Sequence, residues 1–321
     1  MLVSRQKQDS GGVHRPENRI AGHFKKYHQL WLLALPGIIL TLMFAYIPMS
    51  GLVIIFKDYN YRDGIFGSPW VGFKNFEFFF ANFSKAWRAT RNTILLNLCY
   101  TVFGTAMAVM LAVMFNEIRH KKYLKATQSL SIMPYFISWV VVGVFVFSIF
   151  NYETGLINTM ISSLGGEKIN FYMMPMAWPI IICAFNTWKW TGYNSVIYIA
   201  AVTGVDGEIN EAAEIDGATI FQRIRYITLP SIRPTLVTMV LLQIGRILRG
   251  DFEMFYQIVG NNGQLFNATD VIDTYVFRSL ITNPDIGMTA AATFYQSVLC
   301  FAIIMIVNTV VKKIDEDYAL F

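Results

Sequence analysis

Residues 206–230 have the sequence DGEINEAAEIDGATIFQRIRYITLP. Asp206 is a suitable helix N-cap, and acidic residues gather in the turns that follow it, where the positive end of a helix dipole favours them. Gly217 can adopt the positive φ that a turn between two helices needs. Isoleucines at helical spacing then give a second helix one apolar face. Pro230 limits the length of this second helix. The stretch therefore predicts two short helices joined by a tight turn.

On both sides of this stretch the chain is strongly apolar. Of its 321 residues, 55% are hydrophobic and only 15% are charged, whereas soluble domains carry about 25% charged residues. Six stretches have about the 20 apolar residues that a helix needs to cross a bilayer: 30–56, 92–115, 126–150, 174–202, 231–249 and 287–311. Because a helix satisfies its own backbone groups in lipid, we expect an all-α integral membrane protein with six transmembrane helices in one domain, 30–311.

The distribution of lysine and arginine predicts the orientation. Fifteen of these residues lie on one side of the predicted spans and eight on the other. The positive-inside rule places the tails 1–29 and 312–321 and the loop 203–230 in the cytoplasm, and the loop 57–91 outside the cell. The end of the N-terminal tail leaves two alternatives, an interfacial amphipathic helix or a solvated flank. This charge bias explains the net charge of +5, so we expect no nucleic-acid partner.

The residues that an enzyme would need are missing from the sequence. It contains no phosphate-binding G-x-x-x-x-G-K-[ST] loop, no H-E-x-x-H and no G-x-S-x-G,. All four histidines lie outside the predicted spans, and the three cysteines lie dispersed within apolar stretches, where we interpret them as packing residues,. We therefore expect no catalytic residue, no metal site and no cofactor on this chain.

The 206–230 stretch resembles the EAA loop of ATP-binding-cassette (ABC) importer permeases, the binding-protein-dependent transport family. The family pattern is E-A-A, three residues, G, nine residues, I, one residue, L-P. The matching residues are Glu211, Ala212, Ala213, Gly217, Ile227, Leu229 and Pro230. Residues 68–76 and the run Met133-Pro134-Tyr135 also look like segments of maltose-type sugar permeases, most similar to the branch for complex polysaccharides in Gram-positive bacteria.

This resemblance implies a type I importer permease fold in a bacterial cell membrane, with both termini cytoplasmic and with the EAA loop as cytoplasmic coupling helices. The chain would pair with a second homologous permease and form half of a carbohydrate pathway. Two cytoplasmic ATPase subunits would hold ATP and Mg, and an extracellular solute-binding protein would deliver the solute. In the EAA loop Glu211 would contact an ATPase, Ala213 would allow close seating, and Gly217 would set the turn. Ala212, like Ala213, leaves little side-chain bulk, so a partner could approach closely.

A second group of residues is a candidate substrate pathway. A charge at the centre of a bilayer costs about 2.5–3.5 kcal/mol on insertion scales, so charged residues in spans usually face a cavity or the protein interior. Sugars favour aromatic planes and polar groups that donate and accept hydrogen bonds. The candidates are Tyr135, Asn186, Trp188, Lys189, Trp190, Tyr193, Gln243, Arg246, Arg249 and Asp251. Arginine forks suit carboxylates, so we hypothesise an oligosaccharide that carries uronic acid groups.

The sequence leaves alternatives open for the two arginines and for the class of transporter. Arg246 and Arg249 could instead pair with Asp251 or Glu253, or extend to the outer interface. The rival function is a self-contained secondary sugar transporter, which would predict an internal repeat in the sequence.

Overall fold

The computed structural model describes residues 27–81, 83–282 and 284–320. Within these ranges the chain is all-helical and forms no strand, apart from one isolated bridge between Lys57 and Trp70. The choice between an interfacial helix and a solvated flank concerns residues 23–31: residues 23–26 lie outside the described residues, and residues 28–31 form the start of α2.

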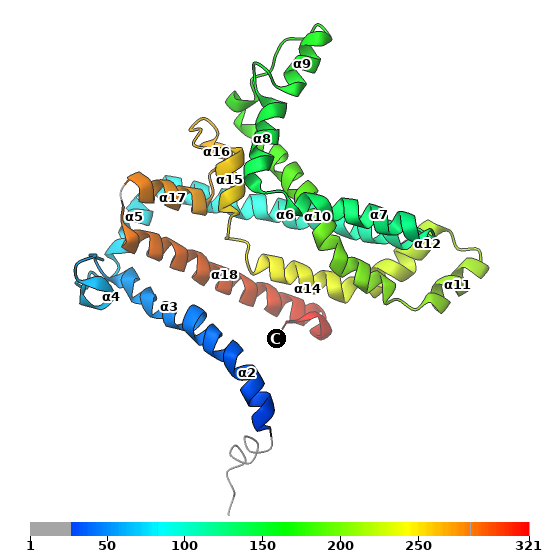
Figure 1. Cartoon of the computed structure of the whole chain (residues 1–321), viewed down its shortest axis with the longest axis horizontal. Helices are drawn as coiled ribbons and strands as arrows, with labels where there is room; N and C mark the ends of the chain where they lie inside the picture. Colours follow the sequence, from blue (N-terminus) through cyan, green and yellow to red (C-terminus); the bar gives the residue numbers. More distant parts are fainter. Residues whose placement is uncertain (1–26, 82, 283, 321) are drawn as a thin grey trace, which may run out of the picture.

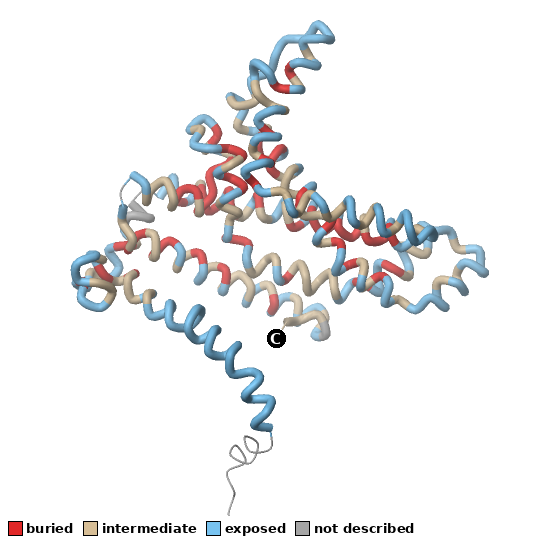
Figure 2. The backbone as a smooth tube through the Cα atoms, viewed as in Figure 1, coloured by how far each residue is buried: buried red, intermediate tan, exposed pale blue. Residues whose placement is uncertain are grey.

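The first helical rod stands away from the rest of the protein. It consists of α2 (His28–Thr41), the π-helical η1 (Leu42–Tyr46), α3 (Ile47–Met49) and the 3-10 helix η2 (Ser50–Phe56). Only Ile55, near its end, is fully buried. Figures 1 and 2 show that the rod diverges from the body and is exposed along most of its length. Its apolar surface is therefore available to lipid or to another protein.

The body is built around long helices that run along one axis of the protein (Figure 1). They are α6 (Phe83–Asn116), α10 (Trp178–Thr203), α14 (Arg233–Ile244) and α18 (Ile286–Ile314). Ala108 and Ala112 of α6 are fully buried against Tyr198 and Val202 of α10. Small residues allow such close packing, which takes the place of the hydrophobic effect inside a membrane.

The third predicted span is broken in the structure. It comprises α7 (Lys121–Ile132), η3 (Met133–Phe136) and α8 (Trp139–Phe150), with a bend of 93°. Pro134 lies at the start of η3, and the two residues after η3 are extended, so the helical hydrogen bonds stop there,. A Cβ on Gly192 of α10 would lie 1.8 Å from the Ser131 carbonyl oxygen, which shows how closely α10 crosses α7 just before the bend.

Three of the described helical rods are long and apolar enough to cross a membrane: His28–Phe56, Phe83–Asn116 and Ile286–Ile314. Two bent pairs raise the number to five if each pair is one span: Lys121–Phe136 with Trp139–Phe150, and Ile220–Ser231 with Arg233–Ile244, the latter bent by 60°. The predicted fourth span corresponds to α10, which has 26 residues but is not among these candidates. The count of six spans therefore stays a prediction.

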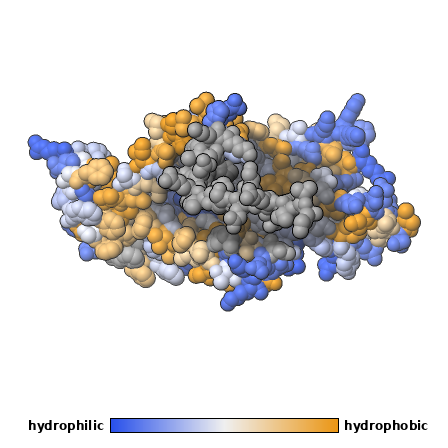
Figure 3. Space-filling model, turned by 90° about the horizontal axis from the view of Figure 1, so that it is seen from below, coloured by the Kyte–Doolittle hydropathy of each residue, from blue (hydrophilic) through white to orange (hydrophobic). Residues whose placement is uncertain are grey.

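Shorter elements connect and flank the long helices. They are α4 (Gly64–Gly67), α5 (Lys74–Ala81), α9 (Leu156–Ser163), η4 (Phe171–Met173), η5 (Pro175–Ala177), α15 (Phe252–Ile258), α16 (Phe266–Thr269), α17 (Ile272–Thr282) and η7 (Glu316–Tyr318). α8 packs against α15, and α9 lies at the tip of this arm (Figure 1). In Figure 3 hydrophobic residues lie on both sides of the grey central region, while hydrophilic residues gather at the two ends of the long axis and in a patch at the lower edge.

Candidate functional site: the 206–230 segment and a broken helix

The 206–230 segment lies at one end of the long axis, as Figure 1 shows for α11 and α12. It forms α11 (Gly207–Ile215), α12 (Ile220–Arg223), the π-helical η6 (Ile224–Thr228) and α13 (Leu229–Ser231). The Asp206 side chain accepts a hydrogen bond from the Glu208 backbone N–H at 2.9 Å and caps α11, as expected from the sequence,.

A tight turn joins the two helices of this segment. Gly217 has a φ of 82°, and a Cβ placed on it would meet no heavy atom within 4 Å. The glycine is therefore required by the backbone conformation and not by lack of space. The Ala218 N–H donates to the Ala213 carbonyl at 2.9 Å and the Gly217 N–H to the Glu214 carbonyl at 3.1 Å. This pair of bonds closes the end of α11 in a Schellman motif.

The second helix of the segment begins with a capping box that our sequence reasoning missed. The Gln222 backbone N–H donates to the Thr219 hydroxyl, while the Gln222 side chain accepts from the Thr219 backbone N–H at 2.7 Å. A T-x-x-Q pattern is the sequence signal for this arrangement. Both helix ends that face the turn are thus fixed by local hydrogen bonds.

The segment exposes apolar and acidic side chains together. Ile215 is 86% exposed and Phe221 is 84% exposed. Glu211 and Ala212 are also exposed, and Ala213 is partly exposed. Beside them is a hollow of about 400 Å³, lined by Ala213, Asp216, Gly217, Ala218, Gln222, Arg223, Tyr226 and Ile227. Exposed large apolar side chains with polar residues around them are typical of an interaction surface.

Four of the predicted pathway residues form one cluster where α10 crosses η3. The Tyr135 ring stacks on the Tyr193 ring, with centroids 4.2 Å apart, and meets the Trp190 ring edge-on at 5.2 Å. Lys189 is only 5% exposed and donates to the backbone carbonyls of Pro134, Tyr135 and Ile137. The Pro134 carbonyl also accepts from the Ile137 backbone N–H at 3.2 Å, but regular helical hydrogen bonding stops after η3, so the ammonium group supplies the donor for the Tyr135 and Ile137 carbonyls,.

The role of Lys189 at the bend gives a testable prediction. Lys189→Met should lower the stability of the folded protein by about 1–3 kcal/mol, because the partly buried carbonyls of Tyr135 and Ile137 would lose this donor,. The apparent Tm in detergent is the measurement. Lys168→Met is the matched control, since Lys168 is more exposed and donates to a single carbonyl, that of Glu153. An equal Tm for the Lys189 variant and the wild type would show that the lysine does not hold the bend.

A second break in the body follows α14, at residues 245–251. The predicted fifth span extends to residue 249, but the helix ends at Ile244, so Arg246 and Arg249 lie beyond it. Side chains from other helices hold the backbone of this break. The Gln296 amide donates to the Leu248 carbonyl at 3.0 Å, and the Gly250 N–H donates to the Asp273 carboxylate at 2.7 Å.

Three more hydrogen bonds complete the support of this break. The Asn97 amide of α6 donates to the Arg249 carbonyl at 3.3 Å. Asp251 caps α15 by accepting from the Met254 N–H and also accepts from the Trp139 indole N–H at 2.8 Å. Sequence reasoning missed Asp273 and Gln296 as supporting residues. A glutamine inside an apolar span was the available signal, because polar groups at that depth need a partner.

The two arginines of the break are exposed and carry no carboxylate partner in an ion pair. Across the described residues, the ion pairs do not include Arg246 or Arg249. Asp251, the alternative partner considered from the sequence, bonds to Trp139 instead. Gln243 lies partly exposed at the end of α14, next to the break. The break therefore presents two exposed guanidinium groups without a close ion pair, of which Arg249 interacts with the Asp273 carboxylate at longer range.

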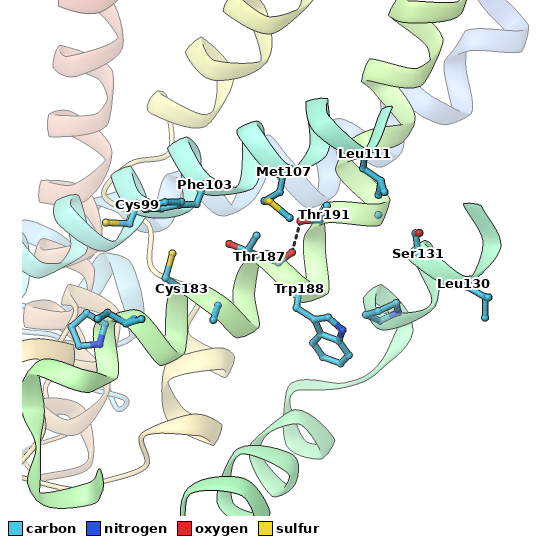
Figure 4. Close-up of a pocket in the computed structure, with 15 residues that line it drawn as sticks. Cys99, Phe103, Met107, Leu111, Leu130, Ser131, Cys183, Thr187, Trp188 and Thr191 are labelled. Atoms are coloured by element: carbon cyan, nitrogen blue, oxygen red, sulfur yellow. Dashed lines mark hydrogen bonds between the residues drawn. The ribbon is translucent and has the colours of Figure 1, made fainter. Parts of the chain in front are cut away.

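Asn186 and Trp188 lie elsewhere on α10. The Asn186 amide contacts the Met254 sulfur at 3.4 Å. Trp188 lines an open hollow of about 810 Å³ among α6, α7 and α10. Figure 4 shows Cys99, Phe103, Met107 and Leu111 along α6 facing this hollow, with Cys183, Thr187, Trp188 and Thr191 along α10. The walls are mostly apolar and suit a lipid chain or a protein helix better than a sugar.

A helical body with apolar spans, a break between two of its helices and an exposed helix–turn–helix segment at one end fits a membrane permease. The chain belongs to the family of binding-protein-dependent transport system inner membrane components, whose family model matches residues 78–316. The resemblance found in the sequence is thus confirmed at the level of the family.

Individual relatives agree with this assignment. Protein LplB of Bacillus subtilis is 36% identical over 295 residues, which cover 91% of each chain. The polygalacturonan/rhamnogalacturonan transport system permease protein YteP of the same organism is 34% identical, over 90% of this chain and 89% of its own. A bacterial ABC transporter involved in the import of the acidic polysaccharide alginate has a similar structure, with a TM-score of 0.81 and 32% identity over 93% of this chain and 100% of the matched chain. The alginate transporter has also been solved in complex with an alginate pentasaccharide-bound periplasmic protein, at a TM-score of 0.80 and 32% identity over 92% of this chain and 98% of that one.

Proposed function

We propose that this chain is the permease subunit of an ABC importer for an acidic oligosaccharide. It forms half of the membrane pathway with a second permease, and it crosses the cell membrane six times with both termini in the cytoplasm. ATP and Mg bind to two separate ATPase subunits, and an extracellular solute-binding protein supplies the solute. Family membership, and the alginate transporter with its periplasmic protein, support this assembly.

The 206–230 segment is the docking site for an ATPase subunit. The observation that carries this proposal is the geometry of the segment: two short helices held at a fixed angle by Gly217 and the two caps, with Ile215 and Phe221 projecting from them. Such a rigid unit can follow the movement of a partner without changing its own shape. Glu211 contacts the ATPase, Ala212 and Ala213 permit close approach, and Leu229 and Pro230 lead into α14.

The solute passes the break at residues 245–251. Irregular backbone at membrane depth is tolerated where it is buried in protein or lines a water-filled cavity, and broken helices form many transporter binding sites. The exposed guanidinium groups of Arg246 and Arg249 fit carboxylates, which agrees with a structural relative that is involved in the import of the acidic polysaccharide alginate. The Tyr135, Trp190 and Tyr193 rings supply apolar faces for sugar rings.

Co-purification tests this assignment. The tagged chain, extracted from its native membrane in mild detergent, should bring down a second permease and an ATPase in stoichiometric amounts. A tagged unrelated permease of the same membrane is the control for non-specific capture. Recovery of this chain alone, or only of copies of itself, would contradict the proposed assembly.

A further inference from the structure

Arg223 connects the 206–230 segment to the end of the longest helix. Its guanidinium Nη1 lies 3.2 Å from Glu214 Oε2 on α11, and its Nη2 lies 3.6 Å from Glu117 Oε2, directly after the end of α6. The Arg223 side chain is only 13% exposed. One planar guanidinium therefore bridges two elements that are far apart in the sequence, which a lysine cannot do with the same geometry.

A neighbouring apolar contact strengthens this connection. Ile224, the next residue, is partly buried against the cluster that contains Ala112 and Val113 of α6. Arg119 also reaches Glu214, at 3.4 Å, but its side chain is 89% exposed. Exposed ion pairs contribute little, so Arg223 is the residue that holds α11 on the end of α6, while Ile224 packs η6 against the same helix.

The other part of α6 contacts the pathway and the opposite end of the protein. With 34 residues, α6 is about 51 Å long at 1.5 Å per residue. Asn97, midway along it, donates to the Arg249 carbonyl in the break. Further along, the Thr93 hydroxyl accepts from the Ile272 N–H at 3.0 Å, and Asn92 donates to the Asn267 carbonyl at 3.2 Å. The same helix thus contacts the 206–230 segment, the break and the loops beyond it.

We propose that Arg223 is a positioning residue for energy coupling: it holds α11 on the end of α6, so that a displacement of the 206–230 segment moves α6 and, through Asn97, the break at residues 245–251. This inference rests on the proposed function of the segment as the ATPase docking site. Arg223 does not touch the solute or ATP. It acts by making the docking segment and α6 one rigid body.

The test measures solute uptake per ATP hydrolysed. The complete importer is reconstituted into proteoliposomes with its binding protein and solute, and Arg223→Gln, Arg223→Lys and the matched control Arg119→Gln are compared with the wild type. Arg223→Gln should keep the ATPase bound but lower uptake per ATP about tenfold, within the range of typical coupling between sites. Arg223→Lys should recover part of the loss, and Arg119→Gln should behave as the wild type.

Glu117→Gln is an independent test, because it removes the ion pair between Arg223 and Glu117 at the end of α6 and leaves Arg223 paired with Glu214. It should lower uptake per ATP several-fold, and it carries the test if Arg223→Gln does not assemble. Wild-type uptake per ATP in Arg223→Gln or Glu117→Gln would overturn the inference, as would loss of the ATPase from the Glu117→Gln complex, which would show a docking role instead. A wild-type complex without bound ATPase would overturn the proposed function, and the inference with it.

Discussion

Replacing Gly217 by valine should reduce ATP-dependent uptake to less than about a tenth of the wild-type rate. A side chain in the left-handed conformation costs about 1–2 kcal/mol, and a β-branched residue is disfavoured further. At a φ of 82°, valine would change the turn and with it the angle between α11 and α12. The two helices would then no longer fit one surface of the ATPase. Uptake into membrane vesicles with ATP is the measurement.

Gly207→Val is the matched control for this prediction. Gly207 begins α11, has no positive φ, and a Cβ on it would meet no heavy atom within 4 Å. Valine there changes helix propensity by less than about 1 kcal/mol and leaves the turn intact. Equal, near-normal uptake by both variants would show that the shape of the turn does not matter for transport.

The double variant Arg246→Gln, Arg249→Gln should lose uptake of uronate oligosaccharides by at least about tenfold. Hydrogen bonds to charged groups contribute about 1.5–3 kcal/mol each, and glutamine keeps polarity but removes both positive charges. A neutral oligosaccharide that enters by the same importer should be taken up at nearly the wild-type rate. Competition between labelled acidic and neutral oligosaccharides in vesicles measures the difference directly.

Arg62→Gln controls for the loss of a positive charge elsewhere. Arg62 is exposed in the loop before α4 and forms no ion pair within the described part of the chain. It should leave uptake of both kinds of oligosaccharide unchanged. Undiminished uronate uptake by the double variant would remove the arginines from the pathway and with them the reason to expect an acidic solute.

The features that depend on neighbours in sequence were predictable. The Asp206 cap and the turn at Gly217 follow from local backbone chemistry, and the structure has both. The apolar stretches around residues 30–56 and 287–311 correspond closely to helical rods, because about 20 apolar residues in lipid leave the backbone little choice but a helix,.

The features that depend on contacts across the fold were not predictable. α14 ends at Ile244, and the backbone of the break that follows is held by Asp273 and Gln296, which are far away in the sequence. Lys189 was a pathway candidate because a charge in a span usually faces a cavity, yet its ammonium binds the carbonyls of the bend in the third predicted span. Hydropathy does not reveal such a bend, because both of its arms are apolar.

We propose that this chain cannot accumulate solute by itself, and that a separate ATPase drives transport through residues 206–230. The most direct test of this proposal compares two sets of proteoliposomes, one with this chain alone and one with the complete importer, both supplied with binding protein, solute, ATP and an imposed ion gradient. The account predicts that solute accumulates only in the second set, and only while ATP is hydrolysed. Accumulation against a gradient by the chain alone would contradict it.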